Sequence, residues 1–464
     1  MNRLKTLKDR VRRLIALLSL GVLFFSSCGI ADMIELRDAA SGPAPYQSKD
    51  AETPKEPAES LPETDPAKIG NEESPGTAPD SGIEASEETA VWIARYEGLF
   101  GEGSADEVLL TPDEIAAYNR RIIDECATVI DIASVPEAVV GDDRLRETAC
   151  SPVPDAEFYD AEGNVIDFSP IFENAAPGSI PDTITPRTAV VTKRCSCTSL
   201  PTSLEVYDNG DTYYSKIQLT ELIVGMPVWV LHESADGAFL FVQSYYYIGW
   251  IPSDSAALCG EEDFRLFAEP EDPVTVIRVS VPCGDTVLDM GVRLPIREEA
   301  DDGWTVSLPT RGEDGRLALA DFELKKDEAV RGYLPYTMRN FYTEAFACLG
   351  TPYGWGGSDG GLDCSGFVCA VFRTFGIYLP RDTRDQKDHA GIAHAADGLT
   401  QEEIDGLLTG SRYPVCLHSP GHVMLCLGEE NGVPTVIHAP RGGEFVTVAP
   451  LEPERVLISL VEMK

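Results

Sequence analysis

The sequence predicts a multi-domain protein, with a partly helical region and two small β-barrels ahead of an α+β domain. Three observations support this fold class. The chain has 464 residues, which is too long for a single core. Its middle part is made of short runs rich in β-branched and aromatic residues. Its last part combines helical patterns, a Gly-rich loop and a cysteine that opens a helix, with strand patterns following.

The first 27 residues have the pattern of an export signal. Six basic residues precede an apolar stretch from Leu14 to Phe25, which is short for a transmembrane helix. Small residues then lead directly to Cys28, a pattern that resembles the lipobox of bacterial lipoproteins. This resemblance implies that Cys28 is lipidated and begins the mature chain. An ordinary cleavage site or an uncleaved anchor stays open, because Phe25 stands where leucine is usual.

The same resemblance implies where the protein lies. An exported, lipidated chain is held on the outer face of the cytoplasmic membrane, or on a periplasm-facing membrane if the envelope has two. Residues 28–88 are acidic and rich in proline, with almost no aromatic residues, so we expect a disordered tether. The formal net charge of −40 argues against a nucleic-acid partner, because phosphate binding needs a basic face.

Residues 89–184 are expected to form a partly helical region. Thr111 can be an N-cap, Pro112 occupies the first helical position, and Glu114 completes a capping box. Apolar residues then recur at helical spacing up to Cys126.

Two strand-rich segments follow, at residues 185–258 and 259–336. Both contain short strands rich in β-branched and aromatic residues, separated by turn signals such as Asp-Asn-Gly and Ala-Asp-Gly in the first. Two small barrels in tandem are the economical interpretation.

Residues 337–464 have a mixed pattern. "MRNFYTEAFACLG" looks helical and stops at Gly350, and the loop "GTPYGWGGSDGGLD" follows. A second helix is expected from Cys364 to about Gly376. Its apolar stripe consists of Phe367, Val368, Val371, Phe372 and Phe375.

Cys364 is expected at the N-terminus of a helix, which is the end that favours a nucleophilic thiolate. A helix N-terminus favours the thiolate and offers unpaired N–H groups to an oxyanion. Of the six histidines, His422 and His438 fall on two successive predicted strands, where antiparallel pairing would place them side by side as base and orienter. His389 and His394 fall in a polar stretch and are expected to be exposed. The alternative is a buried thiol with surface histidines.

The other cysteines show no metal pattern. Cys195 and Cys197 form a single C-x-C with no partner pair, so no metal or cofactor is expected. Cys369 and Cys426 lie inside apolar runs and are expected to be buried. An exported chain could oxidise some cysteines, but the sequence assigns no disulfide pairs.

"TPYGWGGSDGGLDCSGFVCAVFRTFGIYLPRDTRDQ", followed by "GHVMLCLG" and "VIHAP", resembles the NlpC family of cell-wall cysteine peptidases. The resemblance covers residues 337–464 and implies a papain-like core. The family's D-C-S-G cysteine, G-H-V histidine and polar residue on the next strand match Cys364, His422 and His438. Cys426 stands where tyrosine is common, which affects packing more than mechanism.

The preceding segments resemble parts of multi-domain relatives. Both strand-rich segments are similar to bacterial SH3-like domains, and residues 89–184 are similar to an N-terminal stabilising region. The resemblance implies that Tyr247 of the first SH3-like domain lines the substrate cleft. It also implies that Asp382 and Thr383 help to hold a free substrate amine and that Ser365 is a further cleft residue.

The resemblance implies a monomeric peptidoglycan hydrolase, a cysteine endopeptidase that cuts stem peptides, most readily between γ-D-Glu and the diamino acid. Two alternatives stay open. One is a cysteine amidase or acyltransferase on the same core. The other is a non-enzymatic wall-binding lipoprotein.

Overall fold

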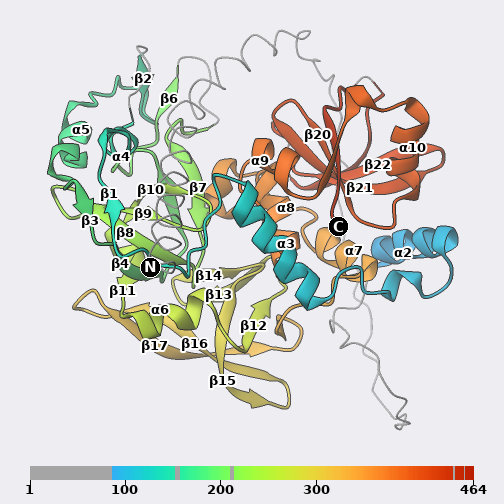
Figure 1. The fold of residues 1–464 in the computed structure, drawn as a ribbon, viewed down its shortest axis with the longest axis horizontal. Helices are drawn as coiled ribbons and strands as arrows, with labels where there is room; N and C mark the ends of the chain where they lie inside the picture. The colour runs from blue at the N-terminus through green and yellow to red at the C-terminus, as the bar shows by residue number, and fades with distance from the viewer. Residues whose placement is uncertain (1–85, 152–156, 209–213, 443–444, 454) are drawn as a thin grey trace, which may run out of the picture.

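The computed structural model describes residues 86–464 except 152–156, 209–213, 443–444 and 454 (Figure 1). The expected signal peptide, Cys28 and all but the end of the expected tether lie outside the described residues. Within the described part, no helix has both the length and the apolar character needed to cross a membrane. The cysteines of this part are free thiols, and both Cys369 and Cys426 are buried as expected.

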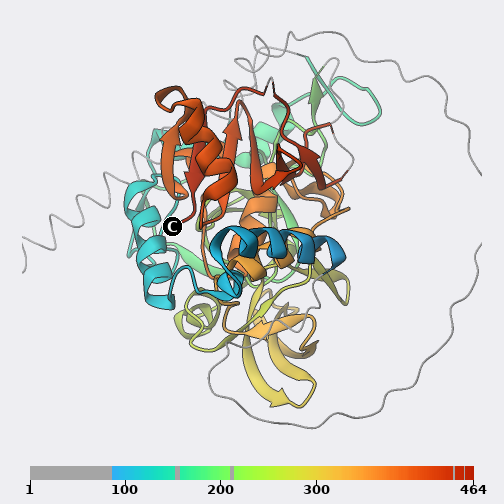
Figure 2. The same ribbon diagram turned by 90° about the vertical axis from the view of Figure 1, so that its right-hand side faces the viewer.

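The N-terminal helices α2 and α3 pack against the C-terminal domain. The predicted helix is α3, where Thr111 and Glu114 form the capping box and Pro112 opens the helix, which confirms that prediction. Asn119 of α3 bonds the backbone of Gly376 and Tyr378 in the C-terminal domain, at 2.7 and 2.9 Å. Figure 2 shows α2 across the base of that domain, beside α7. The elements of this region are α2 (Glu87–Phe100), η1 (Ser104–Asp106), α3 (Pro112–Glu125), β1 (Val139–Val140), α4 (Asp143–Ala149), β2 (Phe158–Tyr159), α5 (Ser169–Ala175), η2 (Pro177–Ser179) and β3 (Thr183–Ile184).

A seven-stranded antiparallel sheet forms the first strand-rich segment, in the order β11-β4-β8-β9-β10-β5-β7. Val190, Val228 and Val242, from three neighbouring strands, are fully buried in its core. Trp250 donates its Nε1–H to Ala149 O at 2.8 Å, so the N-terminal region covers one side. The strands are β4 (Arg187–Val191), β5 (Cys195–Thr198), β7 (Gln218–Leu222), β8 (Pro227–Glu233), β9 (Phe239–Gln243), β10 (Ile248–Pro252) and β11 (Ala256–Leu258); β6 (Tyr207–Asp208) pairs with β2, and η3 (Ser253–Ser255) precedes β11.

The second strand-rich segment opens with a helix that the strand pattern did not predict. This helix, α6 (Glu261–Ala268), has three acidic residues in its first turn, where negative charge favours a helix. Phe264 and Phe267, three residues apart, are both buried on one side. A five-stranded sheet and a short hairpin follow. Their strands are β12 (Pro273–Val276), β15 (Arg293–Ala300), β16 (Gly303–Arg311), β17 (Leu317–Lys325) and β18 (Ala329–Arg331), with β13 (Ser280–Cys283) and β14 (Thr286–Asp289) as the hairpin.

The C-terminal domain is a six-stranded antiparallel sheet with helices on both faces, in the order β19-β24-β20-β21-β22-β23. Because side chains alternate along a strand, Val423 and Leu425 face the core that contains α8, whereas Met424 and Cys426 face α10. All five residues of the predicted apolar stripe are buried, but α8 ends at Arg373, before the expected end near Gly376, so that Phe375 follows the helix. The elements are α7 (Met338–Ala347), η4 (Trp355–Gly360), α8 (Cys364–Arg373), α9 (Thr383–His389), β19 (Ile392–Ala395), η5 (Ala396–Gly398), α10 (Gln401–Gly410), β20 (Val415–Ser419), β21 (His422–Glu430), β22 (Val433–His438), β23 (Thr447–Pro450) and β24 (Ser459–Glu462).

Candidate active site

Cys364 is the first residue of α8, as the sequence predicted. Asp363 is the N-cap and accepts a hydrogen bond from the Gly366 N–H at 2.7 Å. The Gly-rich loop before it packs against the first strand-rich segment. Gly356 and Gly357 have positive φ angles of 62° and 91°, and a side chain at either position would press on residues of β7. Glycine is therefore needed for the loop to approach the barrel.

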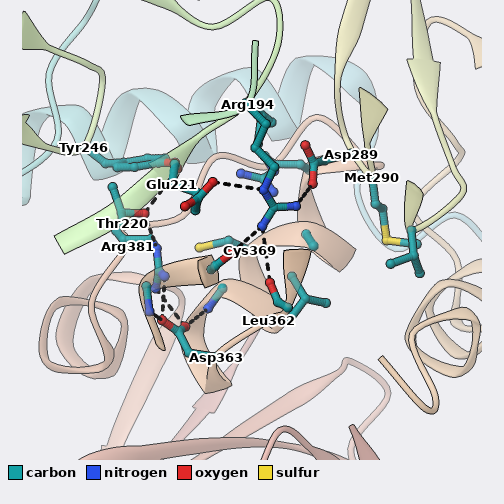
Figure 3. Close-up of a pocket in the computed structure, with 18 residues that line it drawn as sticks. Arg194, Thr220, Glu221, Tyr246, Asp289, Met290, Leu362, Asp363, Cys369 and Arg381 are labelled. Atoms are coloured by element: carbon teal, nitrogen blue, oxygen red, sulfur yellow. Dashed lines mark hydrogen bonds and ion pairs between the residues drawn. The ribbon is translucent and has the colours of Figure 1, made fainter. Parts of the chain in front are cut away.

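A buried ion pair that the sequence analysis missed supports this N-terminus (Figure 3). Arg381 binds Asp363 with both Nη atoms, at 2.9 and 2.6 Å, in the bidentate geometry that strengthens such pairs. Its Nε donates to Thr220 of the first strand-rich segment at 2.9 Å. Burial alone would raise the pKa of Asp363, but Arg381 and the N–H groups of Gly366 and Gly356 lower it below its ordinary value. Arg381 therefore joins the helix of Cys364 to the barrel.

Breaking this pair should destabilise the protein strongly. Asp363→Asn or Arg381→Gln leaves one buried charge without its counter-ion, which typically costs about 3–5 kcal/mol. Chemical denaturation followed by circular dichroism measures the loss. Arg331→Gln is the matched control, because Arg331 also forms a bidentate pair, with Asp272, but is exposed. The control should keep nearly the wild-type midpoint, and an equal effect in the buried and exposed variants would contradict the assignment.

Arg194 forms a second buried junction under the Gly-rich loop (Figure 3). It donates to Glu221 at 3.1 Å and to the Gly357 carbonyl at 2.6 Å, and it pairs with Asp289. These partners lie in the first strand-rich segment, the loop before Cys364 and the second strand-rich segment. One guanidinium thus fixes three parts of the chain against one another.

His422 and His438 meet as the strand pattern predicted. His422 opens β21, His438 ends β22, and His422 Nε2 lies 2.8 Å from His438 Nδ1. Both rings are buried, with 8% and 7% exposure. The backbone N–H of Val423, the residue after His422, interacts with the thiol of Cys364 and stabilises its thiolate form. Cys364 therefore lies beside the start of β21, where His422 is.

The charge state of the thiol differs from the expectation for a helix N-terminus. Burial, with a contribution from Asp363, raises the pKa of Cys364 to about 12, despite the N–H groups of Val423 and Ser365. Burial, the neighbouring His438 and more distant cationic groups lower the pKa of His422 to about 3. The resting pair is consequently a neutral thiol and a neutral imidazole, because the loss of solvation outweighs the helix terminus.

His418 is a third buried histidine that the sequence analysis did not single out. It lies in β20, is 1% exposed, and neither ring nitrogen has a hydrogen-bond partner within the described part of the chain. Burial, with a contribution from Lys387 of α9, lowers the pKa of His418 to about 4. Residues 415–417, directly before it, form a continuous apolar run without alternation, so no local pattern indicated the surroundings of this histidine.

His389 and His394 are not exposed, contrary to expectation. Both are half-buried, and His394 Nε2 lies 3.1 Å from Glu462 Oε2, because the pairing of β19 with β24 brings the two residues together.

Tyr247 and Asp382, from different domains, are in direct contact. The Tyr247 hydroxyl donates to the Asp382 carboxylate, with O–O distances of 3.0 and 3.2 Å. Burial raises the pKa of Asp382 to about 6. Asp382 is the N-cap residue of α9, Thr383 is its first helical residue, and Arg381 before them binds Asp363 next to Cys364. The backbone therefore keeps this pair close to the start of α8.

The Ser365 hydroxyl forms hydrogen bonds with both members of the Arg381–Asp363 ion pair. It accepts a hydrogen bond from Arg381 at 2.8 Å and donates to Asp363 at 3.2 Å. Its side chain thus supports the ion pair. Within the described residues, no group of three or more His, Cys, Asp or Glu side chains is arranged to hold a metal ion.

The comparisons with known proteins agree with this architecture. Residues 350–455 match the NlpC/P60 family, and residues 206–252 match an SH3 domain of the SH3b1 type. The chain is 27% identical over 252 residues to a γ-D-glutamyl-L-lysine dipeptidyl-peptidase of Bacillus cereus, covering 50% of this chain and 70% of the relative. It is 33% identical over 105 residues to the protein of the same name from Bacillus subtilis, covering 22% and 32%.

A solved structure extends the similarity of fold. The NlpC/P60 endopeptidase of Photobacterium damselae subsp. piscicida superposes with a TM-score of 0.65 at 20% identity, covering 79% of this chain and 96% of that one. The SH3 match falls within the first strand-rich segment, and the SH3-like nature of residues 259–336 stays a prediction. The chain therefore contains an NlpC/P60 family domain at residues 350–455, with an SH3 domain of the SH3b1 type ahead of it at residues 206–252.

Proposed function

We propose that this protein is a peptidoglycan hydrolase, a cysteine endopeptidase that cuts stem peptides between γ-D-Glu and the diamino acid. The observation that carries the proposal is Cys364 at the first turn of α8, beside the start of β21, with His422 and His438 in contact. The names of the two Bacillus relatives support the choice of bond. The SH3 domain supports a wall substrate.

His422 is the general base in this proposal. When His422 donates its Nε2–H to His438 Nδ1, its Nδ1 carries the lone pair. This nitrogen is buried and has no hydrogen-bond partner among the described residues. It takes the thiol proton of Cys364 as sulfur attacks the carbonyl carbon, and His438 orients and polarises the ring.

The reaction then follows the order of a thiol acyl transfer. The backbone N–H of Cys364 and that of a neighbour hold the oxyanion at the start of α8. The C–N bond breaks as His422 returns its proton to the leaving amine, which leaves a thioester on Cys364. Water, deprotonated by His422, attacks the thioester and restores the thiol. No metal or cofactor takes part.

Mass spectrometry of muropeptides after incubation with the purified protein tests the function. The expected products are L-Ala-γ-D-Glu and a free diamino acid or the peptide that begins with it. Release of an intact stem peptide from the sugar, or transfer to an added amine, would indicate the amidase or acyltransferase alternative. Binding to wall without any product would indicate a non-enzymatic protein.

The two histidines should contribute unequally. His422→Asn should lower kcat by about 10²–10⁴-fold, to near the background rate, because no group then takes the proton. His438→Asn or His438→Gln should keep measurable activity, because an amide can still accept or donate at the position of Nδ1. Steady-state kinetics on one muropeptide compares the variants. Equal, complete loss in both would remove the distinction between base and orienter.

We also propose that the protein is exported and lipid-anchored through Cys28. Lipid chains, and not the protein's charge of −40, supply the membrane affinity. The acidic, proline-rich segment 28–88 would then act as a tether that keeps the catalytic domain at a distance from the membrane. In fractionated cells, wild-type protein should sediment with membranes and Cys28→Ala should not. Membrane association of Cys28→Ala, with residues 1–27 still attached, would indicate an uncleaved anchor instead.

A further inference from the structure

A cavity of about 310 Å³ lies where four parts of the chain meet. Its walls come from α3 and the segment after it, from both strand-rich segments, and from Arg373 and Tyr378 of the catalytic domain. Arg373 is the last residue of α8, so the cavity adjoins the opposite end of the helix from Cys364. Its size is at the lower limit of ordinary small-molecule sites, which are about 300–1,000 Å³.

The apolar part of the wall is mainly aliphatic. It includes Ile123, Val129, Ile223, Val224, Met226 and Val292. Such a wall favours an aliphatic chain, because burial of each CH₂ group contributes about 0.8 kcal/mol and needs no directional partner.

The polar part contains two buried groups without partners. Arg373 is 8% exposed, its Nε has no hydrogen-bond partner in the described part of the chain, and no carboxylate there forms an ion pair with its guanidinium. Tyr245 is 9% exposed, and its hydroxyl has no hydrogen-bond partner among the same residues. Both side chains line the cavity. Buried polar groups are normally satisfied, so these two indicate a missing acceptor.

The surrounding groups compensate this positive charge only in part. Arg293, which also lines the cavity, donates to the Tyr333 hydroxyl at 2.9 Å and lies over the Tyr378 ring at 4.9 Å, so its partners are uncharged. Asp289 is buried nearby and its charge also acts on Arg373, but it forms its ion pair with Arg194 and does not line the cavity.

Acidic side chains at the cavity lie outside its buried part. Asp131 and Glu269 line the cavity but are exposed. The inner end of the cavity is therefore cationic, the rim carries carboxylates, and the wall between them is aliphatic. A ligand that fits this arrangement has one acidic group at the end of an apolar body.

We propose that this cavity binds an aliphatic monocarboxylate of medium length. Its carboxylate accepts hydrogen bonds from Arg373 and Tyr245, and Arg293 adds a second positive charge. Its chain lies against the aliphatic wall. Both guanidiniums bind carboxylates well, because their N–H groups match the two oxygens. The proposal concerns binding alone and does not depend on the hydrolase activity.

Calorimetric titration of the full chain with sodium octanoate tests the proposal. We expect saturable binding at one site per chain, with 1-octanol and sodium acetate each binding at least tenfold more weakly. Arg373→Gln should weaken octanoate binding at least tenfold, because it removes the charge-assisted contact. Tyr245→Phe, which removes only the hydroxyl, should weaken binding about threefold to tenfold, and thermal melts check that both variants are folded.

Arg297→Gln is the matched control. Arg297 lies on β15 like Arg293, but it is exposed, pairs with Asp321 and does not line the cavity. The control should bind octanoate as the wild type does. The proposal is overturned if octanol binds as tightly as octanoate, if folded Arg373→Gln and Tyr245→Phe bind like the wild type, or if no saturable binding occurs.

Discussion

Replacement of Cys364 by alanine should abolish hydrolysis and leave the fold intact. The substitution removes the sulfur that forms the acyl intermediate, and no other group at the start of α8 can replace it. Only one buried atom is lost at a residue that is 8% exposed, so the cost in stability should be about 1 kcal/mol. Muropeptide products measured by mass spectrometry should fall to background, while the thermal melt changes little.

Cys369→Ala is the control for this prediction. Cys369 lies on the same helix, is 1% exposed, and contacts Gln386 Nε2 at 3.3 Å and the Pro380 carbonyl at 3.4 Å. This variant should keep its activity and lose about 1–2 kcal/mol of stability, because the sulfur only packs in the core and contacts neighbouring polar groups. If Cys369→Ala were inactive and Cys364→Ala active, the assignment of the nucleophile would be wrong.

Features set by neighbouring residues were predictable from the sequence. The capping box of Thr111 and Glu114 fixed the start of α3, since both partners lie within one turn. The loop and the apolar stripe likewise placed Cys364 at the start of α8. The patterns of two successive strands predicted that His422 and His438 lie on neighbouring strands, but their exact offset also depends on the irregular pairing between Cys426 and Gly428.

Features that depend on distant residues were not predictable in the same way. The ion pair of Arg381 with Asp363 spans 18 residues and also involves Thr220, so no local pattern reveals it. The resemblance suggested that Tyr247 and Asp382 share a cleft, but their contact joins residues 135 positions apart. The high pKa of Cys364 is equally non-local, because it depends on how completely the surrounding chain excludes water.

The contact of Tyr247 with Asp382 predicts that the enzyme prefers a substrate with a free amine. We expect the enzyme to cut L-Ala-γ-D-Glu-diamino acid much faster than the same peptide with an acetylated amine. The Asp382 carboxylate would pair with the substrate ammonium, with Tyr247 holding it in place, and acetylation removes both the charge and the donors. A buried polar group left without its partner rejects the altered substrate, so the ratio of kcat/KM should exceed about 10².

Asp382→Asn should lose most of this preference, whereas Asp388→Asn should keep it. Asp388 lies on the same helix, but it is exposed and pairs with Lys387. The comparison needs both substrates with all three proteins. Equal rates of the wild type on the two substrates would contradict a free-amine requirement and favour an enzyme that acts on intact wall.

The pH dependence gives an independent test of the same group. Burial raises the pKa of Asp382 to about 6, so its carboxyl is charged above that pH and neutral below it. The preference for the free amine should therefore be full at pH 7.5 and shrink as the pH falls through 6 toward 5. The base does not obscure this loss, because the pKa of His422 is lowered to about 3 and the imidazole stays neutral throughout. In Asp382→Asn the ratio of the two rates should not change with pH over this range, since no group there titrates against the substrate amine. A wild-type preference that persists at pH 5 would mean that the amine is held by another group.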